Sequence, residues 1–269
     1  MLIDGVPSDQ LPATDRGLAY GDGLFETIRI HRGNLLFLEQ HLQRLVLGCT
    51  RLGIPVDQKR WRDWLDKALV EAGPTGILKL IVTRGSGGRG YKPSDTAQPR
   101  CIISAHPLPA QHPDPRYGIR AFVCEQRLAD QPVLAGIKHL NRLEQVLASR
   151  EFPDSSWHEG LMRDYAGNII EGTRSNLFIA IQGKLYTPEL SRCGIAGILR
   201  GQLIEVFGDR LQVADLPASC LDDADEIFVC NSVLGIWPLV ELRYAGLARE
   251  LQVGNFAHEA LRWFDGVLA

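Results

Sequence analysis

The chain has 269 residues, of which 45% are hydrophobic and 23% are charged, the ordinary balance of a globular protein with a buried core. Its net charge of −3 gives no electrostatic reason to expect nucleic acid or an anionic membrane as a partner. No segment approaches the ~18 apolar residues that a membrane-spanning helix needs, and residues 1–5 lack the basic head of a signal peptide. We therefore expect a cytoplasmic protein.

The six cysteines form no Cys-x-x-Cys pair and no close cluster with histidine. Several of them lie inside apolar runs, as Cys101 does before Ile102, and a free thiol packs there as a small hydrophobic group. We therefore expect neither a disulfide framework nor a bound metal.

In the first half of the chain, hydrophobic spacing predicts two helices and several strands. Apolar residues at 4-3-4-3 spacing indicate a helix over 38–52 that ends at Gly53, and a second helical pattern covers about 58–72. Residues 25–30 alternate as a strand does, with Phe25, Thr27 and Arg29 on one face. Further strands are expected on both sides of Asp4-Gly5, at 77–83 and at 101–105.

Two glycine-rich loops interrupt these elements. The backbone of residues 15–23 can come close to a ligand or to another chain, or it simply crosses the surface. Residues 84–91 carry Arg84, Arg89 and Tyr91, but they lack the Lys-Ser/Thr pair of a phosphate-binding P-loop. A lid whose arginines meet a carboxylate suits this loop better.

Four prolines make residues 107–117 the best candidate for an interdomain linker. The linker would separate a domain of residues 1–106 from a second domain of residues 118–269. In the second domain the patterns predict strands at 119–124, 211–216 and 226–229, hairpins at 160–172 and 175–187, a helix that opens at 194–200 and runs to about 207, and a closing helix at 255–268.

Lys138 closes the apolar run 133–137 and stands before a helical pattern made by Leu140, Leu143, Val146 and Leu147. A lysine at such a junction can point into a cavity, where burial lowers the pKa of its amine and makes it able to attack a carbonyl. The alternative is a solvated lysine, which is what most lysines are.

Other residues could complete a site around such an amine. Glu171 ends the apolar strand 169–170, so its carboxylate can lie at a pocket edge. Gly197 precedes a helix whose first-turn amides, those of Ile198 and Leu199, can bind a phosphate. The remaining candidates for phosphate contacts are the guanidinium of Arg44 and the side chains of Asn231 and Ser232.

Each of these signals alone is also typical of a surface residue, a turn or a helix cap. Together they fit one cofactor. Pyridoxal phosphate needs a lysine for its aldehyde, a cup for its phosphate and a partner for its ring nitrogen. An acidic partner keeps that nitrogen protonated, which makes the ring a strong electron sink.

The order of these residues resembles that of the fold-type-IV pyridoxal-phosphate enzymes, which include branched-chain and D-amino-acid transaminases and aminodeoxychorismate lyases. The stretches 86–91 and 134–145 are most similar to the aminodeoxychorismate lyases, which make 4-aminobenzoate and pyruvate for folate synthesis. The matching elements run through most of the chain in the same order, and they are residues 20–26, 41–45, Lys138, 170–178 and 197–200.

This resemblance implies an α/β (α+β-like) fold with a smaller N-terminal domain, a larger C-terminal domain with a strand-rich core, and the cofactor between them. It also implies a homodimer. Lys138 would form the Schiff base and shuttle protons, and Glu171 would face the pyridine nitrogen. The phosphate would be held by Arg44, by Gly197 and the amides of Ile198 and Leu199, and less directly by Asn231 and Ser232. A substrate carboxylate would meet Arg89 and Tyr91, with Arg29 and Thr27 as weaker substrate-side candidates.

The activity implied is the conversion of 4-amino-4-deoxychorismate to 4-aminobenzoate and pyruvate, through an aldimine and a quinonoid of the cofactor. Two alternatives remain. A transaminase of the same fold would use the same lysine, glutamate and phosphate cup, and would differ in its substrate loops. A non-catalytic module that binds a phosphate ligand would leave Lys138 solvated and would carry no reducible cofactor.

Overall fold

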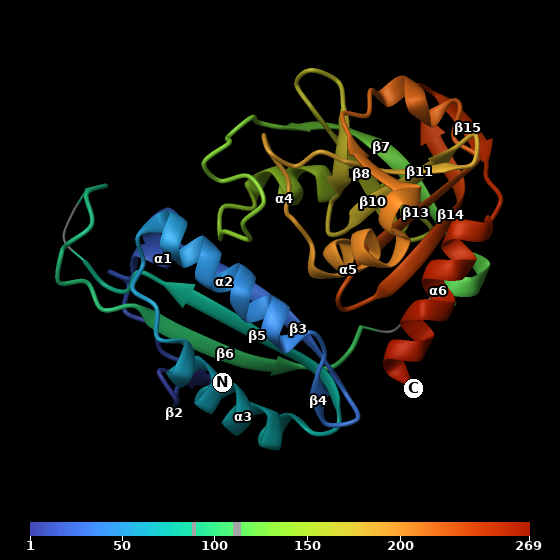
Figure 1. The fold of residues 1–269 in the computed structure, drawn as a ribbon. Coiled ribbons are helices and arrows are strands. Elements are labelled where there is room, and N and C mark those ends of the chain that lie inside the picture. Colours follow the sequence, from blue (N-terminus) through green and yellow to red (C-terminus); the bar gives the residue numbers. More distant parts are fainter. Residues whose placement is uncertain (88–89, 110–113) are drawn as a thin grey trace. The chain divides into compact units, whose positions relative to one another are not determined.

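The computed structural model describes residues 1–87, 90–109 and 114–269, and the chain forms two compact units (Figure 1). The first unit comprises the described part of Met1–Pro109 together with Ile137–Asn141. The second comprises residues 114–136 and Arg142–Ala269. The five residues around Lys138 therefore belong to the first unit, although the chain on both sides of them belongs to the second. The linker expected at 107–117 lies partly outside the described residues.

The first unit is an antiparallel sheet with two long helices. The strand order is β2-β1-β6-β5-β3-β4. Its elements are β1 (Leu2–Ile3), β2 (Val6–Pro7), α1 (Arg16–Tyr20), β3 (Gly23–His31), β4 (Asn34–Leu35), α2 (Leu38–Leu52), α3 (Gln58–Ala72), β5 (Thr75–Thr83) and β6 (Arg100–His106).

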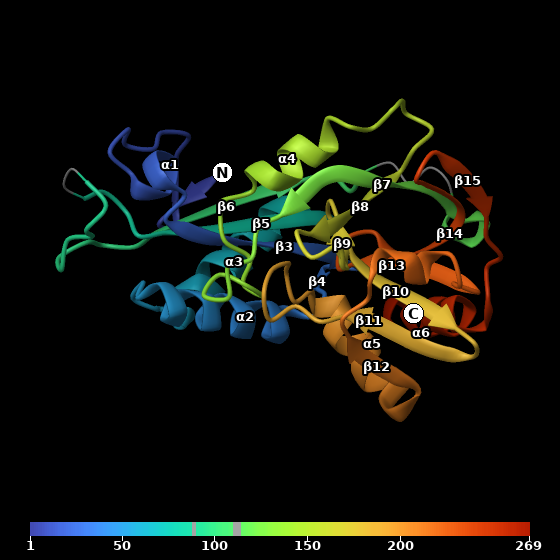
Figure 2. The ribbon, with the colours of Figure 1, turned by 90° about the horizontal axis from the view of Figure 1, so that it is seen from above.

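The hydrophobic core of this unit lies on one face of the sheet. Strand β3 alternates as predicted, so that Leu24, Ile28 and Ile30 are buried. Helix α2 packs beside β3, and α3 packs beside β5 and β6, on the same face (Figure 2). The predicted bounds of both helices are confirmed. The opposite face of β3, which carries Phe25, is left without a helix of this unit.

The loop expected at 15–23 is partly helical. Residues Arg16–Tyr20 form the short helix α1, because the Asp15 side chain accepts a hydrogen bond from the Gly17 amide and Gly21 ends the helix in the left-handed conformation, with φ of 66°. The expectation of an irregular loop was therefore wrong for these five residues, where a cap and a terminating glycine frame one helical turn.

The second unit is built on a nine-stranded mixed sheet. The order is β12-β11-β10-β13-β14-β7-β8-β9, and β15 pairs with β14. Its elements are β7 (Ile119–Leu128), α4 (Leu143–Ser149), β8 (Glu159–Asp164), β9 (Ile169–Gly172), β10 (Asn176–Ile181), β11 (Lys184–Pro188), α5 (Ile198–Phe207), β12 (Leu211–Ala214), β13 (Glu226–Asn231), β14 (Gly235–Tyr244), β15 (Leu247–Glu250), α6 (Asn255–Leu268) and the 3-10 turns Pro115–Tyr117, Gly208–Arg210 and Ala218–Leu221.

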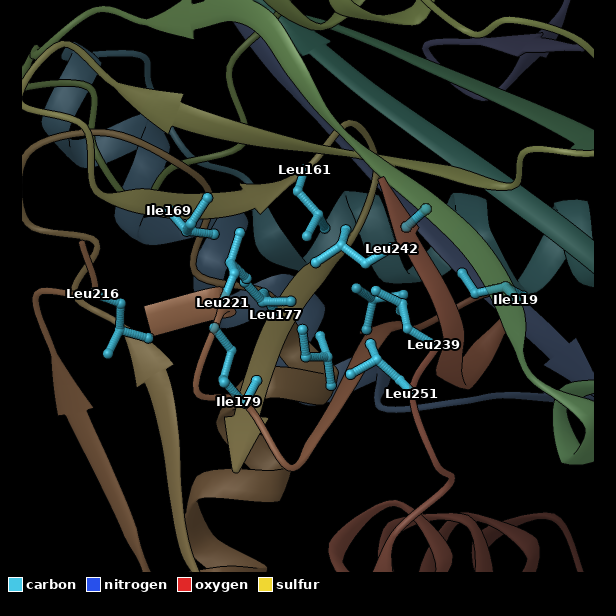
Figure 3. Close-up of a cluster of buried hydrophobic side chains, with 14 of the residues drawn as sticks. Ile119, Leu161, Ile169, Leu177, Ile179, Leu216, Leu221, Leu239, Leu242 and Leu251 are labelled. Atoms are coloured by element: carbon cyan, nitrogen blue, oxygen red, sulfur yellow. The ribbon is translucent and has the colours of Figure 1, made fainter. Parts of the chain in front are cut away.

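The main core of this unit lies inside the curved sheet. Side chains from opposite parts of the sheet meet there, as Leu161 of β8, Leu177 of β10 and Leu239 of β14 do (Figure 3). Strand β9, at one end of the strand order, contacts β10 and β11, so the sheet curls back on itself. The mixed α/β architecture and the strand-rich second part agree with the predicted fold class.

The prediction for the helix after Lys138 was wrong in two respects. The helical pattern was expected from Leu140, but the helix begins only at Leu143. The expected apolar stripe of that helix is exposed: Leu143 keeps 74% of its surface and Val146 keeps 54%, while Gln145 is buried. The helix packs on β7 and β8 through its other side.

Strands β14 and β15 were not predicted. Pro238 lies in the middle of β14, opposite Phe228 of β13, where a proline lacks the amide that a central strand normally donates. The run was therefore not read as a strand, although β14 is central in the sheet. Among the described residues, no helix has the length and apolar character required to cross a membrane.

Replacement of Leu45 by alanine tests the packing of α2 on β3. Leu45 keeps 1% of its surface, so Leu45→Ala should lower the free energy of unfolding by about 2–5 kcal/mol. Leu47 lies on the same helix but keeps 54% of its surface, so Leu47→Ala should change it by less than about 0.5 kcal/mol. Urea unfolding followed by circular dichroism measures both. Equal effects would contradict the assigned buried face.

Candidate active site

Lys138 lies beside the N-terminal end of β3. The amide of Phe25 donates to the carbonyl of Lys138 at 2.9 Å, and the amide of Leu140 donates to the carbonyl of Gly23 at 3.0 Å. Residues 138–140 thus run along β3 as a short antiparallel extension, with Leu24 opposite His139. Lys138 is half-buried, and its Nζ lies 4.3 Å from the centroid of the Phe25 ring. It is therefore not the solvated lysine of the alternative interpretation.

Several cations share this face of the first sheet. Phe25, Thr27 and Arg29 point to the face opposite the core because side chains alternate along β3. Lys79 of β5 pairs with Thr27, and its Nζ lies 5.4 Å from the centroid of the Phe25 ring. Burial lowers the pKa of Arg29 from its ordinary high value. The face offers several positive groups to an anionic substrate.

A buried ionic cluster lies on the other face of β3. Glu26, 1% exposed, accepts hydrogen bonds from Arg44 Nε at 2.8 Å and from a second nitrogen of the same guanidinium. His41 Nδ1 lies 2.6 Å from the second oxygen of Glu26. Burial alone would raise the pKa of Glu26, but Arg44 and His41 outweigh it and lower that pKa to about 2.

The histidine of this cluster is neutral at pH 7. Burial lowers the pKa of His41 and outweighs the opposing effect of Glu26, and Lys138 lowers it further. The proton therefore lies on Nδ1, where it is donated to Glu26, and the buried Nε2 has no hydrogen-bond partner among the described residues. The influence of Lys138 on His41 shows that the cluster and the lysine are electrostatically coupled.

The glycine-rich loop at 84–91 is held by its flanks. Arg84 is buried and donates to both oxygens of Asp22 and to the carbonyls of Leu52 and Gly53 at the end of α2. It is therefore committed to structure and does not act as a lid arginine, unlike the expectation for this loop. Tyr91 is 85% exposed and its ring lies 5.5 Å from the ring of Tyr20. Arg89 lies outside the described residues.

Arg16 of α1 fixes the far end of the same loop. Its two terminal nitrogens donate to the carbonyls of Gly90 and Tyr91 at 2.9 and 2.7 Å, and its Nε donates to Asp22 at 2.9 Å. Asp22 thus joins Arg16 and Arg84, and both guanidiniums help to keep its pKa low although burial opposes them. The sequence offered no pattern for this link, because α1 was read as a loop.

In the second unit, Glu171 lies on β9 and is 3% exposed. One carboxylate oxygen accepts a hydrogen bond from the Ile195 amide at 2.8 Å, and the other accepts one from Gln145 Nε2 at 3.3 Å. A carboxylate held by an amide on each side keeps a fixed orientation, which suits a partner for a ring nitrogen. Gln145 reaches Glu171 because α4 buries this side chain and exposes its apolar stripe.

Helix α5 begins at Ile198 with Gly197 as its N-cap. No side chain among the described residues caps this end, so the first-turn amides of Ile198 and Leu199 remain available to an external acceptor. A Cβ at position 197 would lie 1.9 Å from Asn176 Oδ1, whose amide donates to the Ile195 carbonyl at 2.8 Å. Gly197 is therefore required for the close approach of Asn176.

Asn231 ends β13 and organises the turn that follows. Its side-chain oxygen accepts the amides of Val233 and Leu234 at 3.0 and 2.7 Å, and its Nδ2 donates to the carbonyl of Arg174 at 3.1 Å. It therefore links the β13–β14 turn to the loop after β9, with little hydrogen-bonding capacity left for a ligand. Ser232 follows it and is half-buried.

The structure groups the predicted residues within each unit. Lys138 and the substrate-side pair Thr27 and Arg29 share one face of the first sheet, and Arg44 lies beyond its other face. In the second unit, Glu171 is bonded to Ile195, two residues before the cap of α5. The residues that the sequence did not reveal are Lys79, Glu26, His41, Gln145 and Arg16. Of these, Glu26, His41 and Gln145 stood in the motif stretches named above.

Comparisons with known proteins identify the family. The model of the family described as Amino-transferase class IV matches residues 23–242. The chain is 38% identical over 244 residues to aminodeoxychorismate lyase of Vibrio harveyi, covering 88% of this chain and 89% of that protein. It is 30% identical to D-alanine aminotransferase of Bacillus licheniformis, covering 85% and 81%. The chain therefore belongs to the class IV aminotransferase family.

A solved structure is similar over almost the whole length. The crystal structure of 4-amino-4-deoxychorismate lyase from Pseudomonas aeruginosa matches with a TM-score of 0.93 at 45% identity, covering 98% of this chain and 98% of that chain. The resemblance to fold-type-IV enzymes found in the sequence is thereby confirmed, and so is the predicted fold class.

The ionic cluster predicts an acid-sensitive contribution to stability. The pKa of Glu26 falls from 4.5 to about 2 on folding, so its charge stabilises the native state above pH ~4.5 and loses this effect as the pH falls toward about 2. Urea unfolding at several pH values measures this effect. As the pH falls over this window, the free energy of unfolding of the wild type should decrease by on the order of 3 kcal/mol more than that of Glu26→Gln.

Glu39 on α2 provides the control for that measurement. Its pKa is lowered by the hydrogen bond and the charge of Arg62 at the surface. Such exposed pairs contribute little to stability, so Glu39→Gln should leave the pH dependence close to that of the wild type. A wild-type curve parallel to that of Glu26→Gln would show that Glu26 is not held ionised.

Proposed function

We propose that the protein is a pyridoxal-phosphate-dependent lyase that converts 4-amino-4-deoxychorismate to 4-aminobenzoate and pyruvate, a reaction of folate biosynthesis. The observation that carries this proposal is the similarity to two aminodeoxychorismate lyases over nearly the whole chain, at 38% and 45% identity. The half-buried Lys138 and the oriented carboxylate of Glu171 support it from the chemistry of the side chains.

The described residues fit this cofactor. Lys138 supplies an amine for its aldehyde, Glu171 an acceptor for its ring nitrogen, and the uncapped start of α5 supplies amides for its phosphate. Arg44 is the proposed cationic contact of the phosphate, with its orientation set by Glu26. When bound, the cofactor withdraws electrons from the carbon that carries the substrate amine.

Lys138 is the proposed acid and base of the reaction. Once it is displaced from the cofactor by the substrate amine, its Nζ would take the hydrogen from the ring carbon that bears this amine. Glu171 would keep the proton on the ring nitrogen, because the Ile195 amide and Gln145 hold its carboxylate in place. The bond between the neighbouring ring carbon and the enolpyruvyl oxygen would then break, and the ring would become aromatic. The enolpyruvate that leaves would take up a proton at its methylene carbon, equivalent to the one that Lys138 removed, and become pyruvate.

The cationic face of the first sheet would receive the substrate. Aminodeoxychorismate carries two carboxylates, and this face carries Arg29 and Lys79 together with the hydroxyl of Thr27. Arg89 and Tyr91 remain proposed substrate contacts, and Arg16 holds the backbone carbonyls of Gly90 and Tyr91. Orientation of the ether beside the reacting carbon would be the main contribution of these groups.

A transaminase is the second candidate, and the 30% identity to a D-alanine aminotransferase favours it. It would use Lys138 and Glu171 in the same way, but it would return the proton to the cofactor and would need a keto acid to complete each cycle. A non-catalytic phosphate-binding module is disfavoured, since it would have no use for a half-buried lysine over an aromatic ring.

We also infer a homodimer in which a second copy covers helix α4. Leu143, Val146 and Leu147 lie on one face of this helix and keep 74%, 54% and 45% of their surfaces. An apolar helix face of this kind is typical of an interaction surface. A cytoplasmic location remains a prediction from the sequence.

A lyase needs only one substrate, whereas a transaminase also needs a keto acid, so an assay without keto acid distinguishes the two activities. Purified protein should convert aminodeoxychorismate to equal amounts of 4-aminobenzoate and pyruvate over many turnovers with no keto acid present. Chromatography of 4-aminobenzoate and a coupled assay of pyruvate measure both products. A single turnover that resumes only after addition of a keto acid would identify a transaminase and overturn the proposal.

Lys138→Ala tests the role of the lysine. Borohydride should attach the cofactor irreversibly to Lys138 in the wild type, and peptide mapping should find the label on this residue. Lys138→Ala should take up no label and should lose at least ~10³-fold in turnover, because one residue supplies both the anchor and the base. Lys184→Ala, an exposed lysine of β11, serves as the control. A label on Lys79 or Lys184 would contradict the assignment.

A further inference from the structure

The second unit contains a cavity that none of the residues proposed for the active site lines. Its volume is about 490 Å³, within the range of small-molecule sites. It opens where strands β7, β8 and β14 part. The pairing of β14 with β7 ends at Arg243 and Phe122, and the register of β7 with β8 breaks between Val123 and Arg127. The ends of these strands, together with the segment after α4 and the turn between β14 and β15, therefore form this cavity.

Two arginines of the lining form no salt bridge among the described residues, although the charge of Arg243 helps to lower the pKa of Glu241 and of Asp154. Arg120 and Arg44 are half-buried and each pairs with a glutamate. By contrast, neither Arg163 nor Arg243 forms a salt bridge with any acid in the described part of the chain. Arg163 Nε is buried without a hydrogen-bond partner among the described residues, and one terminal nitrogen makes a long bond of 3.3 Å to the Cys124 carbonyl. A buried donor without an acceptor is costly, so a ligand that accepts here gains affinity.

Aromatic rings hold these guanidiniums in place. The Cζ of Arg243 lies 4.2 Å from the ring centroid of the buried Trp157, and the Cζ of Arg163 lies 5.8 Å from that of Tyr244. Phe122 and Tyr244 also line the cavity. Two oriented guanidiniums favour a carboxylate, and the rings provide flat apolar surface for a planar group.

The lining also contains two acids. Glu151 accepts the backbone amides of Glu125 and Gln126 at 2.6 and 2.8 Å, which fixes its carboxylate at the irregular part of β7. Glu125 is exposed at the rim. Each carboxylate oxygen has a second lone pair, so these groups can accept from an amine of the ligand.

We infer that this cavity is a second binding site, for an aromatic carboxylate that carries an amino group. The choice of 4-aminobenzoate as the probe rests on the proposed function, of which it is the product, whereas the site itself rests on the lining residues. Arg163 and Arg243 bind the carboxylate, Phe122 and Tyr244 contact the ring, and the amine donates to the glutamates.

The test is titration calorimetry of 4-aminobenzoate into the full chain with its cofactor. The wild type should show a binding event that Arg163→Gln and Arg243→Gln each weaken at least ~10-fold, because each removes a charge-assisted contact. Benzoate should bind more weakly than 4-aminobenzoate, and aniline, which lacks the carboxylate, should show no binding at this site. Arg210→Gln, an exposed arginine that does not line the cavity, should behave as the wild type.

Folding of each variant is checked by circular dichroism and thermal melting. Arg243 is exposed at the end of β14, so Arg243→Gln keeps the test decisive if Arg163→Gln does not fold. Absence of the event in the wild type, or equal affinity in the arginine variants, overturns the inference. If the wild type shows lyase turnover but no such binding, the second site is contradicted and the proposed function stands. If it shows this binding but no turnover, the proposed function is contradicted and the second site stands.

Discussion

Two backbone hydrogen bonds, between Phe25 and Lys138 and between Leu140 and Gly23, hold Lys138 against the first sheet. The chain on both sides belongs to the second unit, so these bonds, together with the one from Asn141 Nδ2 to the Gly21 carbonyl, bring residues 137–141 into the first. Strand β3 can accept them because its other neighbour, β4, pairs only at the far end, with Ile30 and His31. The position of the lysine is thus set by main-chain pairing, and its Nζ lies over the ring of Phe25.

The strand that positions the lysine also separates two electrostatic environments. On its core face, Glu26 is ionised and bonded to Arg44 and His41, and loss of Arg44 would leave its buried charge without the compensating cation. On its opposite face, Phe25 lies between Lys138 and Lys79. The negative charge of Glu26 is thus enclosed on the core face, and the positive charges of Lys138 and Lys79 lie on the other face.

The sequence predicted the parts of the fold that depend on local periodicity. Helices α2 and α3 were found with their bounds because apolar residues repeat along one face and glycines end them. The same rule failed at α4, whose apolar face is exposed and whose buried face includes Gln145. It failed at β14 as well, since Pro238 contradicts local strand rules and is tolerated only through the pairing on both sides.

The same distinction, between residues marked by a local sequence pattern and residues placed by the tertiary fold, applies to the candidate site. Lys138, Glu171 and Gly197 could be found in the sequence because each follows or precedes a glycine or an apolar run in a recognisable order. The side chains that orient them could not. Gln145 meets Glu171 from 26 positions away, and Arg16 meets Tyr91 from 75 positions away. Such contacts depend on the tertiary fold, which no local pattern encodes.

The same division bears on the choice between elimination and amino transfer. The lysine, the glutamate and the helix start would serve both reactions, so they cannot select between them. What differs is the substrate. In aminodeoxychorismate, the carbon that loses its proton is next to a carbon with an ether that can leave, and its loss gives an aromatic ring. The substrate of a transaminase carries no such leaving group. We propose that selection comes from the residues that would meet the substrate, on the outer face of β3 and β5 and at the loop whose ends Arg16 and Arg84 hold. Reaction specificity in this family would then be changed by altering the first unit, with the proton-transfer residue and its partner for the ring nitrogen left as they are.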